Sequence, residues 1–447
     1  MILHGGGGQP AATVRLSKLA SVQDAIVSVN RGLTPHYVNI IEWLSKDGIP
    51  LDGCDSNLIE MLEALARSGS VELHAGLTRD KLILIPSRDD FKLHLDLISS
   101  DCLWQVSRFA YMHFSDGVLV ARSPIADCWL SVNDETVSEI LYSLKLPSHL
   151  PASEPNDYVM NACRMLARAQ IIVPCGSSGE PFEAHDPEYR QWDFHDLLFH
   201  SLSRLGRTTQ RMGGVYAFRG EIEPLPAAKE HQWAGSFCAL PRPDIPRLSQ
   251  IDISLTTAIE TRRSIRQYSI VPLSLEQLGE FLFRTVRTRY ILPTAAGELL
   301  SRPYANGGGI YEQEFYVTID ACLDYPRGFY YYDHINHGLC LISYPTADME
   351  LLIDEASASA ARAVRPQVVI TIASRFHRLG WKYRGMAYAT QLKNVGAIYQ
   401  TMYLVATSMN VGGCALGIGN SDRLCRMTGE DYLVESSIGE FMLGRSL

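Results

Sequence analysis

The 447-residue chain has no excess of basic residues, no long apolar run and no secretory start. Its 40 lysines and arginines are outnumbered by 49 aspartates and glutamates, and the net charge of −9 argues against nucleic acid as a partner. No run approaches the roughly 18 apolar residues of a membrane span. Residues 1–13 lack the basic and apolar segments of a signal peptide. We therefore expect a cytoplasmic protein without a membrane partner, whose residues 1–13 are a flexible or expression-derived start.

Metal-binding patterns are also missing. The ten cysteines are scattered without a Cys-x-x-Cys pair, which indicates reduced, packed thiols and neither a disulfide framework nor a zinc site. His195 and His200 are five residues apart, whereas side chains four apart share a helix face. His334 and His337 form a His-x-x-His pattern. We predict no metal site.

The first half of the chain contains a weak internal repeat. Amphipathic helices are predicted in residues 57–69, 133–147 and 157–168, and the first and last run into strand-like segments. Helix, helix and strand pair is the winged-helix pattern, which predicts module 1 at residues 14–100 and module 2 at 101–185. Such modules suggest DNA, which the acidic balance disfavours. The alternatives are a packing domain without a ligand, or a wing edge that binds an extended peptide by strand addition.

The second half is predicted to be a separate domain. Residues 221–250 contain five prolines and are typical of an extended linker, so residues 186–250 are predicted to form a connector. Beyond it, strands are predicted at 315–324 and 367–374 and a long apolar helix at 394–410. This mixture predicts an α+β fold for residues 251–447, in which helices cover a sheet.

The segment TRRSIRQYS places three arginines around one hydroxyl, namely Arg262, Arg263, Ser264 and Arg266. Guanidinium groups donate forked hydrogen bonds that match phosphate oxygens, and crowded arginines repel one another unless an anion lies between them. An isolated segment of this kind could equally be a solvated basic turn. Two glycine-rich stretches, at 302–314 and 409–420, match neither a P-loop nor a Rossmann fingerprint. Together the three segments favour a large cofactor with a phosphate tail.

Several segments carry a family resemblance. TRRSIRQYS resembles the FMN-phosphate motif of the nitroreductase superfamily. SRPYANGGGIYEQEFYV (301–317), GFYYYDHINHGL (328–339) and WDFHDLLFHSLSRLGR (192–207) resemble segments of its SagB-type dehydrogenases, the azoline oxidases of thiazole- and oxazole-containing peptide biosynthesis. The layout is most similar to that of cyanobactin thiazoline oxidases, whose N-terminal modules resemble winged-helix peptide clamps.

The resemblance implies bound FMN and a nitroreductase-like fold for residues 251–447. It implies that the arginine cluster holds the phosphate and ribityl oxygens, and that the isoalloxazine ring lies along two loops. The implied cofactor-binding residues are Arg262, Arg263, Ser264, Arg266, Asn306, Gly307, Gly308, Ala415, Leu416, Gly417 and Arg445. Ala305 and Asn306 depart from the usual Pro-Ser of the family, and Asn306 retains an amide that can donate to a flavin edge. The resemblance also implies a homodimer. For His334 and His337 it implies packing or substrate contacts and no metal.

The azoline-oxidising branch carries a Lys-Tyr pair that matches Lys382 and Tyr383. Aromatisation of a thiazoline removes one hydrogen as a proton and one as a hydride, and the proton needs a base. A lysine ammonium can stabilise a neighbouring phenolate, which makes such a pair suitable, and either member could be the base. By itself, a lysine followed by tyrosine is more often a surface lysine beside a packed tyrosine. Nearby Tyr388, Gln391, Lys393 and Asn394 are predicted to shape the pocket or to pack around it.

These observations predict an FMN-dependent oxidase that converts thiazoline or oxazoline rings of a ribosomally made peptide into thiazole or oxazole. The expected partner is an azoline-containing precursor peptide, held by its leader on the N-terminal modules. The alternatives are an NAD(P)H-dependent nitro or flavin reductase, a non-catalytic peptide-binding scaffold with a flavin fold, and a winged-helix regulator that senses flavin.

Overall fold

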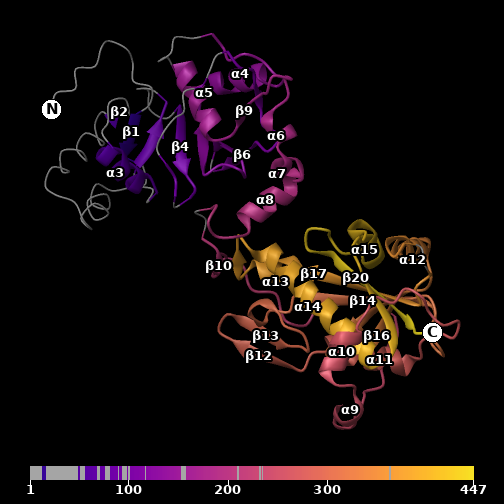
Figure 1. Cartoon of the computed structure of the whole chain (residues 1–447). Helices are drawn as coiled ribbons and strands as arrows, with labels where there is room; N and C mark the ends of the chain where they lie inside the picture. The colour runs from indigo at the N-terminus through magenta and orange to yellow at the C-terminus, as the bar shows by residue number, and fades with distance from the viewer. Residues whose placement is uncertain are drawn as a thin grey trace. The chain divides into compact units, whose positions relative to one another are not determined.

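The computed structural model (Figure 1) divides into two units, Met1–Gln210 and Arg211–Leu447, and each is described by itself. The residues that the structure describes are 13–16, 49–50, 56–67, 71–75, 81–88, 90–92, 98, 101–115, 117–152, 158–208, 211–230, 233, 235–361 and 364–447. The predicted start at residues 1–13 lies almost wholly outside this part of the chain.

The first unit is built on one antiparallel sheet in the order β2-β1-β3-β4-β8-β7-β6. Its strands are β1 (Thr13–Leu16), β2 (Ile49–Pro50), β3 (Val71–His74), β4 (Leu82–Pro86), β6 (Tyr111–Ser115), β7 (Val118–Arg122) and β8 (Cys128–Val132). Pairing of β4 with β8, with Leu82 opposite Val132, joins the strands of the two predicted modules into a single sheet. The strands β5 (Trp104–Val106) and β9 (Ile172–Pro174) form a separate ladder.

Three amphipathic helices supply the core of this unit, close to the positions predicted from the apolar spacing. They are α3 (Ser56–Arg67), α4 (Glu135–Ser143) and α5 (Tyr158–Arg168). Leu62, Ile140 and Leu166, one from each helix, are buried in the same cluster as Leu84 and Leu130 of the sheet. Three short helices follow, α6 (Phe182–His185), α7 (Pro187–Arg190) and α8 (Phe194–Leu202). The shared sheet and shared core mean that the two predicted modules fold together.

The second unit contains a seven-stranded antiparallel sheet in the order β11-β16-β15-β14-β17-β20-β19. The strands are β11 (Phe237–Ala239), β14 (Gln313–Ile319), β15 (Gly328–Asp333), β16 (Gly338–Ser343), β17 (Val368–Arg375), β19 (Val411–Leu416) and β20 (Glu435–Arg445). Smaller elements are β10 (Gly213–Gly214) paired with β18 (Tyr383–Arg384), and the hairpin of β12 (Tyr290–Thr294) and β13 (Gly297–Ser301).

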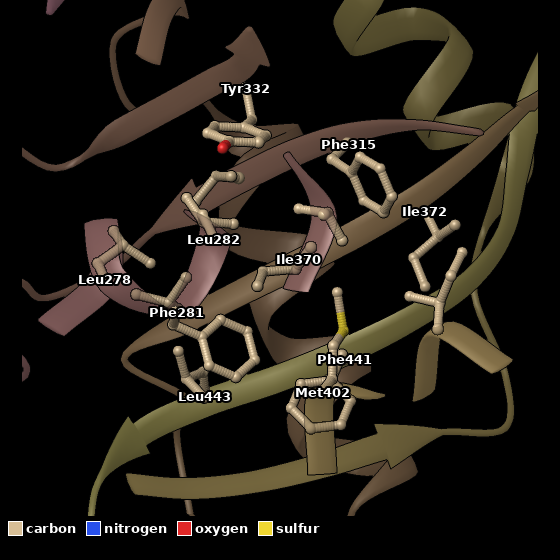
Figure 2. Close-up of a cluster of buried hydrophobic side chains, with 14 of the residues drawn as sticks. Leu278, Phe281, Leu282, Phe315, Tyr332, Ile370, Ile372, Met402, Phe441 and Leu443 are labelled. Atoms are coloured by element: carbon tan, nitrogen blue, oxygen red, sulfur yellow. The ribbon is translucent and has the colours of Figure 1, made fainter. Parts of the chain in front are cut away.

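Helices cover both faces of this sheet (Figure 1). The helices of this unit are α9 (Ile245–Ile251), α10 (Leu255–Thr261), α11 (Leu275–Val286), α12 (Ala347–Ser359), α13 (Phe376–Gly380), α14 (Ala387–Ser408) and α15 (Ser421–Thr428), with a 3₁₀ turn η2 at Gly307–Gly309. Successive strand residues alternate between the faces. Figure 2 shows the larger core, where Phe281 and Met402 pack against Ile370 and Phe441. Met442 belongs to a separate cluster with Ala356 of α12.

The proline-rich segment differs from the predicted connector. Residues from Arg211 onward belong to the second unit, and β11 pairs with β16 as an edge strand of the large sheet, with Cys238 opposite Leu339. The physical reason is that an extended, proline-rich chain can still offer a few backbone groups to a sheet edge. The α+β architecture of the second unit agrees with the prediction.

Candidate functional site

The first site cluster joins the arginine-rich segment to the strand β19. Helix α10, capped by Ser254, ends at Thr261 and releases residues 262–266 as an irregular segment. The hydroxyls of Ser264 and Tyr403 are 2.8 Å apart, and the amide of Ala415 donates to the Tyr403 hydroxyl at 2.9 Å. A single tyrosine of α14 therefore connects two of the predicted cofactor-binding segments.

The arginines of this cluster are available to an anion. The Arg262 guanidinium lies 5.0 Å from the centre of the Tyr403 ring, in a cation–π arrangement. Arg263, Arg266 and Arg445 are exposed. Within the described part of the chain, none of these four side chains takes part in an ion pair. Cationic side chains without carboxylate partners are suited to a phosphate.

Glycines on β19 and β20 allow the segment to lie directly against the sheet. A methyl group at Gly412 would be 2.9 Å from the Tyr268 ring, and one at Gly444 would be 2.5 Å from it. The backbone is held there because the Ile265 amide donates to the Gly413 carbonyl at 3.0 Å and the Ser269 amide to the Arg445 carbonyl at 2.8 Å. Arg445 therefore lies at the end of a strand that this segment follows.

The second cluster forms around the glycine loop. Gly308 has φ = +66°, in the left-handed region that favours glycine. A methyl group there would overlap the Tyr383 hydroxyl and would be 2.8 Å from the Lys382 Nζ atom. The Lys382 ammonium also donates to the Gly308 carbonyl at 3.3 Å. The two predicted catalytic side chains thus converge on one point of a predicted flavin-binding loop.

The start of α14 anchors this loop. The Gly307 amide donates to Asn394 Oδ1 at 3.0 Å, and the Asn394 amide nitrogen donates to Glu312 at 2.9 Å. The Asn306 side chain donates to Glu312 at 3.2 Å and to Gln313 at 3.1 Å, and it accepts from the Tyr311 amide at 2.8 Å. The Asn306 side chain therefore shapes the loop through contacts within the chain, and its contact with a flavin edge stays a prediction.

A buried arginine ties the surroundings of Lys382 together. Arg378 donates to the carbonyls of Ile310, Leu225 and Glu298 at 2.9, 2.6 and 2.8 Å. Burial, followed by nearby arginines, lowers the pKa of Arg378 to about 10, so the side chain stays cationic at neutral pH. Arg378 and Lys382 both line a cavity of about 70 Å³. The glycine loop, the hairpin and the chain before β11 are thereby fixed beside Lys382.

The other predicted ring-contacting loop, Ala415–Gly417, is held by Tyr399. Its hydroxyl accepts from the Glu440 amide at 2.9 Å and donates to the Leu416 carbonyl at 3.3 Å. The Leu416 side chain is buried in the core, so only its backbone faces the loop, whereas Gly417 is exposed. Directly after this loop, Ile418 and Gly419 line a cavity of about 620 Å³.

The Glu440 carboxyl packs beneath the same loop. It is 7% exposed, and a side chain at Gly419 would overlap it. Burial raises the pKa of Glu440 to about 7, with a hydrogen bond from Ser437 acting in the opposite direction and the charge of Glu355 adding to the rise. A buried carboxyl that titrates near neutrality therefore supports the loop.

The remaining candidate residues divide into packed and exposed groups. Gln391 is buried and donates to the Phe376 carbonyl at 3.5 Å, whereas Tyr388 is half-exposed beside Phe376 and Lys393 is exposed. Tyr403, Tyr399, Glu312 and Arg378 were missed by the sequence analysis, because each acts through a partner far away in the chain. Their only signal in the sequence was a position on the long helix or beside a motif.

The histidines of the His-x-x-His pattern are both engaged in the interior. His334 Nδ1 lies 2.8 Å from the Thr288 hydroxyl, and its Nε2 lies 3.4 Å from Glu314. His337 lies 2.8 Å from the Tyr332 hydroxyl and 3.0 Å from the Pro241 carbonyl. Among the described residues there is no cluster of three or more His, Cys, Asp or Glu side chains that could hold a metal ion. A search of the described helices likewise finds none with the length and apolarity to cross a membrane.

Comparisons with known proteins identify two regions. Residues 104–209 match the family model of the cyanobactin oxidase ThcOx, and residues 259–444 match the nitroreductase family model. The chain is 27% identical over 166 residues to a putative nitroreductase of Methanocaldococcus jannaschii, which covers 37% of this chain and 79% of the relative.

Solved structures that match part of the chain include the following two. A putative nitroreductase from Ralstonia eutropha has 20% identity and a TM-score of 0.38, and the match covers 53% of this chain and 99% of that one. The Escherichia coli microcin synthetase McbBCD complex, solved with truncated pro-MccB17 bound, has 16% identity and a TM-score of 0.35, with coverage of 52% and 91%. The chain therefore combines a C-terminal region similar to the nitroreductase family with a preceding segment similar to the cyanobactin oxidase ThcOx.

Proposed function

We propose that this oxidoreductase is an FMN-dependent azoline oxidase, which converts thiazoline or oxazoline rings of a ribosomally made peptide into thiazole or oxazole. The observation that carries the proposal is the convergence of Lys382 and Tyr383 on Gly308. The match of residues 104–209 to a cyanobactin oxidase supports a peptide substrate.

The residues present fit FMN. Arg262, Arg263, Arg266 and Arg445 would hold the phosphate, because they are cationic and have no ion-pair partner within the described residues. Gly417 leaves open space beside the backbone for a flat ring, whereas Gly307 and Gly308 let the loop backbone lie close to Thr390 and Tyr383. Ser264 and Ala415 would be positioned by Tyr403. When bound, FMN supplies the acceptor for two electrons and one hydrogen.

The chain itself supplies the base. Aromatisation breaks two C–H bonds of the azoline ring, and one hydrogen leaves as a proton to the Lys382–Tyr383 pair. The Lys382 ammonium is held by the Gly308 carbonyl, and its Nζ atom lies 5.3 Å from the centre of the Tyr383 ring. Either member of the pair is proposed as the base that accepts the proton. The active unit is proposed to be a homodimer, and the N-terminal unit a winged-helix peptide clamp that holds the leader of the precursor peptide.

The test is an anaerobic absorbance titration of the purified chain. We expect flavin bands that bleach when a thiazoline-containing peptide is added and that do not bleach with NADH alone. Lys382→Met and Tyr383→Phe should retain the bands and lose the bleaching, whereas Tyr344→Phe, at an exposed tyrosine outside the site, should behave as wild type. Absence of a flavin band after addition of FMN would overturn the phosphate assignment.

A second candidate, an NAD(P)H-dependent reductase, is favoured by the similarity to a putative nitroreductase over the C-terminal region. It predicts bleaching by NADH and no response to the thiazoline peptide. The same titration therefore separates the two functions. The reductase also predicts that residues before 190 are dispensable for activity.

A further inference from the structure

Two adjoining cavities lie in the first unit, within and beside the segment that matches the cyanobactin oxidase. The smaller has a volume of about 30 Å³ and the larger about 250 Å³. Pro124, Ser201 and Arg207 line both of them, so the two spaces are neighbours. Neither takes part in the flavin chemistry proposed above, which belongs to the second unit.

The smaller cavity is lined by cations and hydroxyls. Arg122 and Arg207 face it together with the hydroxyl residues Ser87, Tyr111 and Ser123, and no Asp or Glu among the described residues lines it. Arg122 ends β7 opposite Tyr111 of β6, and its guanidinium lies 4.7 Å from the centre of the Trp129 ring. The stacking fixes a forked donor at the cavity wall.

Two polar groups at this cavity have no partner within the described part of the chain. The Ser123 hydroxyl belongs to a side chain that is 6% exposed, and it forms no hydrogen bond. The Nε atom of Arg122 is likewise buried without a partner. The carboxylate nearest in sequence, Asp127, is bound by Arg168 at 2.9 Å. Because buried donors are normally satisfied, these groups point to a ligand that accepts hydrogen bonds.

The larger cavity has a different character. Trp192 stacks on His200 with ring centres 5.7 Å apart, and Ile125 and Leu197 add apolar surface. Glu188 is its single carboxylate among the described residues. The Trp192 and His200 rings suit an aromatic or apolar side chain, while Glu188 and Arg207 add one charge of each sign to the lining.

We infer that the two cavities form a binding site for a carboxylate-bearing peptide segment. The carboxylate binds to Arg122, Ser123 and Arg207, and a neighbouring apolar side chain of the peptide enters the larger cavity. The volume of about 30 Å³ is close to that of a single water in the liquid and suits the end of a carboxylate. Two oxygens of a carboxylate match the forked guanidinium. The inference rests on the proposed function in one respect, namely that the precursor peptide is the molecule that carries the carboxylate.

The test uses the full chain and two matched probes, N-acetyl-Asp-Phe-amide and N-acetyl-Asn-Phe-amide, with binding followed by ligand-observed NMR. We expect the Asp probe to bind at least about tenfold more tightly than the Asn probe, because the Asn probe cannot form the charge-assisted hydrogen bond. Arg122→Gln and Arg207→Gln should remove this preference. Arg207 is exposed, so its variant should fold normally, and Arg204→Gln, an exposed arginine that lines neither cavity, serves as the control.

Equal binding of the Asp and Asn probes, or an equal effect of Arg204→Gln and Arg207→Gln, would overturn the inference. Sodium acetate and inorganic phosphate are titrated separately. If either binds as tightly as the Asp probe, the site is a general anion site and the peptide assignment is wrong. Because the measurement involves no flavin, loss of the azoline-oxidase function alone would leave the Asp preference intact.

Discussion

Glu440 provides a prediction whose magnitude follows from the structure. Its carboxyl lies beneath the loop Ala415–Gly417, is 7% exposed and has a pKa raised by burial to about 7 from the ordinary value of 4.5. One unit of pKa displacement corresponds to about 1.4 kcal/mol, so the displacement represents a cost of about 3 kcal/mol for carrying the charge in the folded chain. Glu440→Gln removes that charge and keeps the shape of the side chain.

The direction of the pH effect on stability follows from which state binds the Glu440 proton more tightly. Between pH 4.5 and about 7 the folded chain holds the Glu440 proton while the unfolded chain releases it. The folded chain is therefore favoured at low pH, and its stability decreases as pH rises through this window. Glu440→Gln should lack this part of the pH dependence. Its advantage over wild type in the free energy of unfolding should grow by about 2 to 3 kcal/mol between about pH 5 and pH 8.

Thermal unfolding across this pH range measures the effect. For a unit of this size, 1 kcal/mol corresponds to roughly 2–4 °C, so the melting temperatures should separate by roughly 4–12 °C at the alkaline end. Glu223→Gln, at an exposed position, controls for loss of a surface charge. Parallel pH profiles for wild type and Glu440→Gln would refute the reasoning, because they would mean that Glu440 is ionised throughout.

Three further substitutions test the site. Gly308→Ala should abolish azoline oxidation while FMN stays bound. The added methyl group would displace Tyr383 and Lys382, and the φ of +66° strains any residue other than glycine. Turnover and flavin absorbance measure the two effects. Tyr403→Phe should weaken FMN about tenfold, since the hydroxyl that joins Ser264 to Ala415 is lost; flavin fluorescence measures the affinity. Arg378→Met should lower the free energy of unfolding by about 3 kcal/mol or more, because three carbonyls lose a charged donor; urea unfolding measures it.

Matched controls separate local from general effects. Gly179→Ala shares a positive φ of +81° but meets no atom within 4 Å, so it tests backbone strain without the clash at Gly308. Tyr344→Phe removes an exposed hydroxyl, and Arg247→Met removes an exposed guanidinium. Each variant has an outcome that would contradict the contact it removes or disturbs. These outcomes are full activity of Gly308→Ala, unchanged FMN affinity of Tyr403→Phe and wild-type stability of Arg378→Met.

The sequence by itself was enough for much of the local structure and for the family resemblance. The apolar spacing located α3 and α5 to within a few residues, because a helix face depends only on neighbours three and four positions away, whereas α14 begins at Ala387, well before the predicted start at residue 394. TRRSIRQYS and the glycine-rich stretches indicated the nitroreductase superfamily, since such motifs are contiguous in the chain. The convergence of Lys382 and Tyr383 on the glycine loop agrees with their predicted role, which remains a proposal.

Only the tertiary structure decided contacts that join distant segments. The pairing of β4 with β8 merged the predicted modules into one sheet, and the pairing of β11 with β16 drew the proline-rich segment into the second unit. Ser264 and Tyr403 are 139 positions apart, and no local pattern records that their hydroxyls meet. Asn306 turns inward because Glu312 and Gln313 offer acceptors in the folded chain. Long-range hydrogen bonds and burial in a common core determine these contacts, and the spacing of neighbouring residues does not predict either of them.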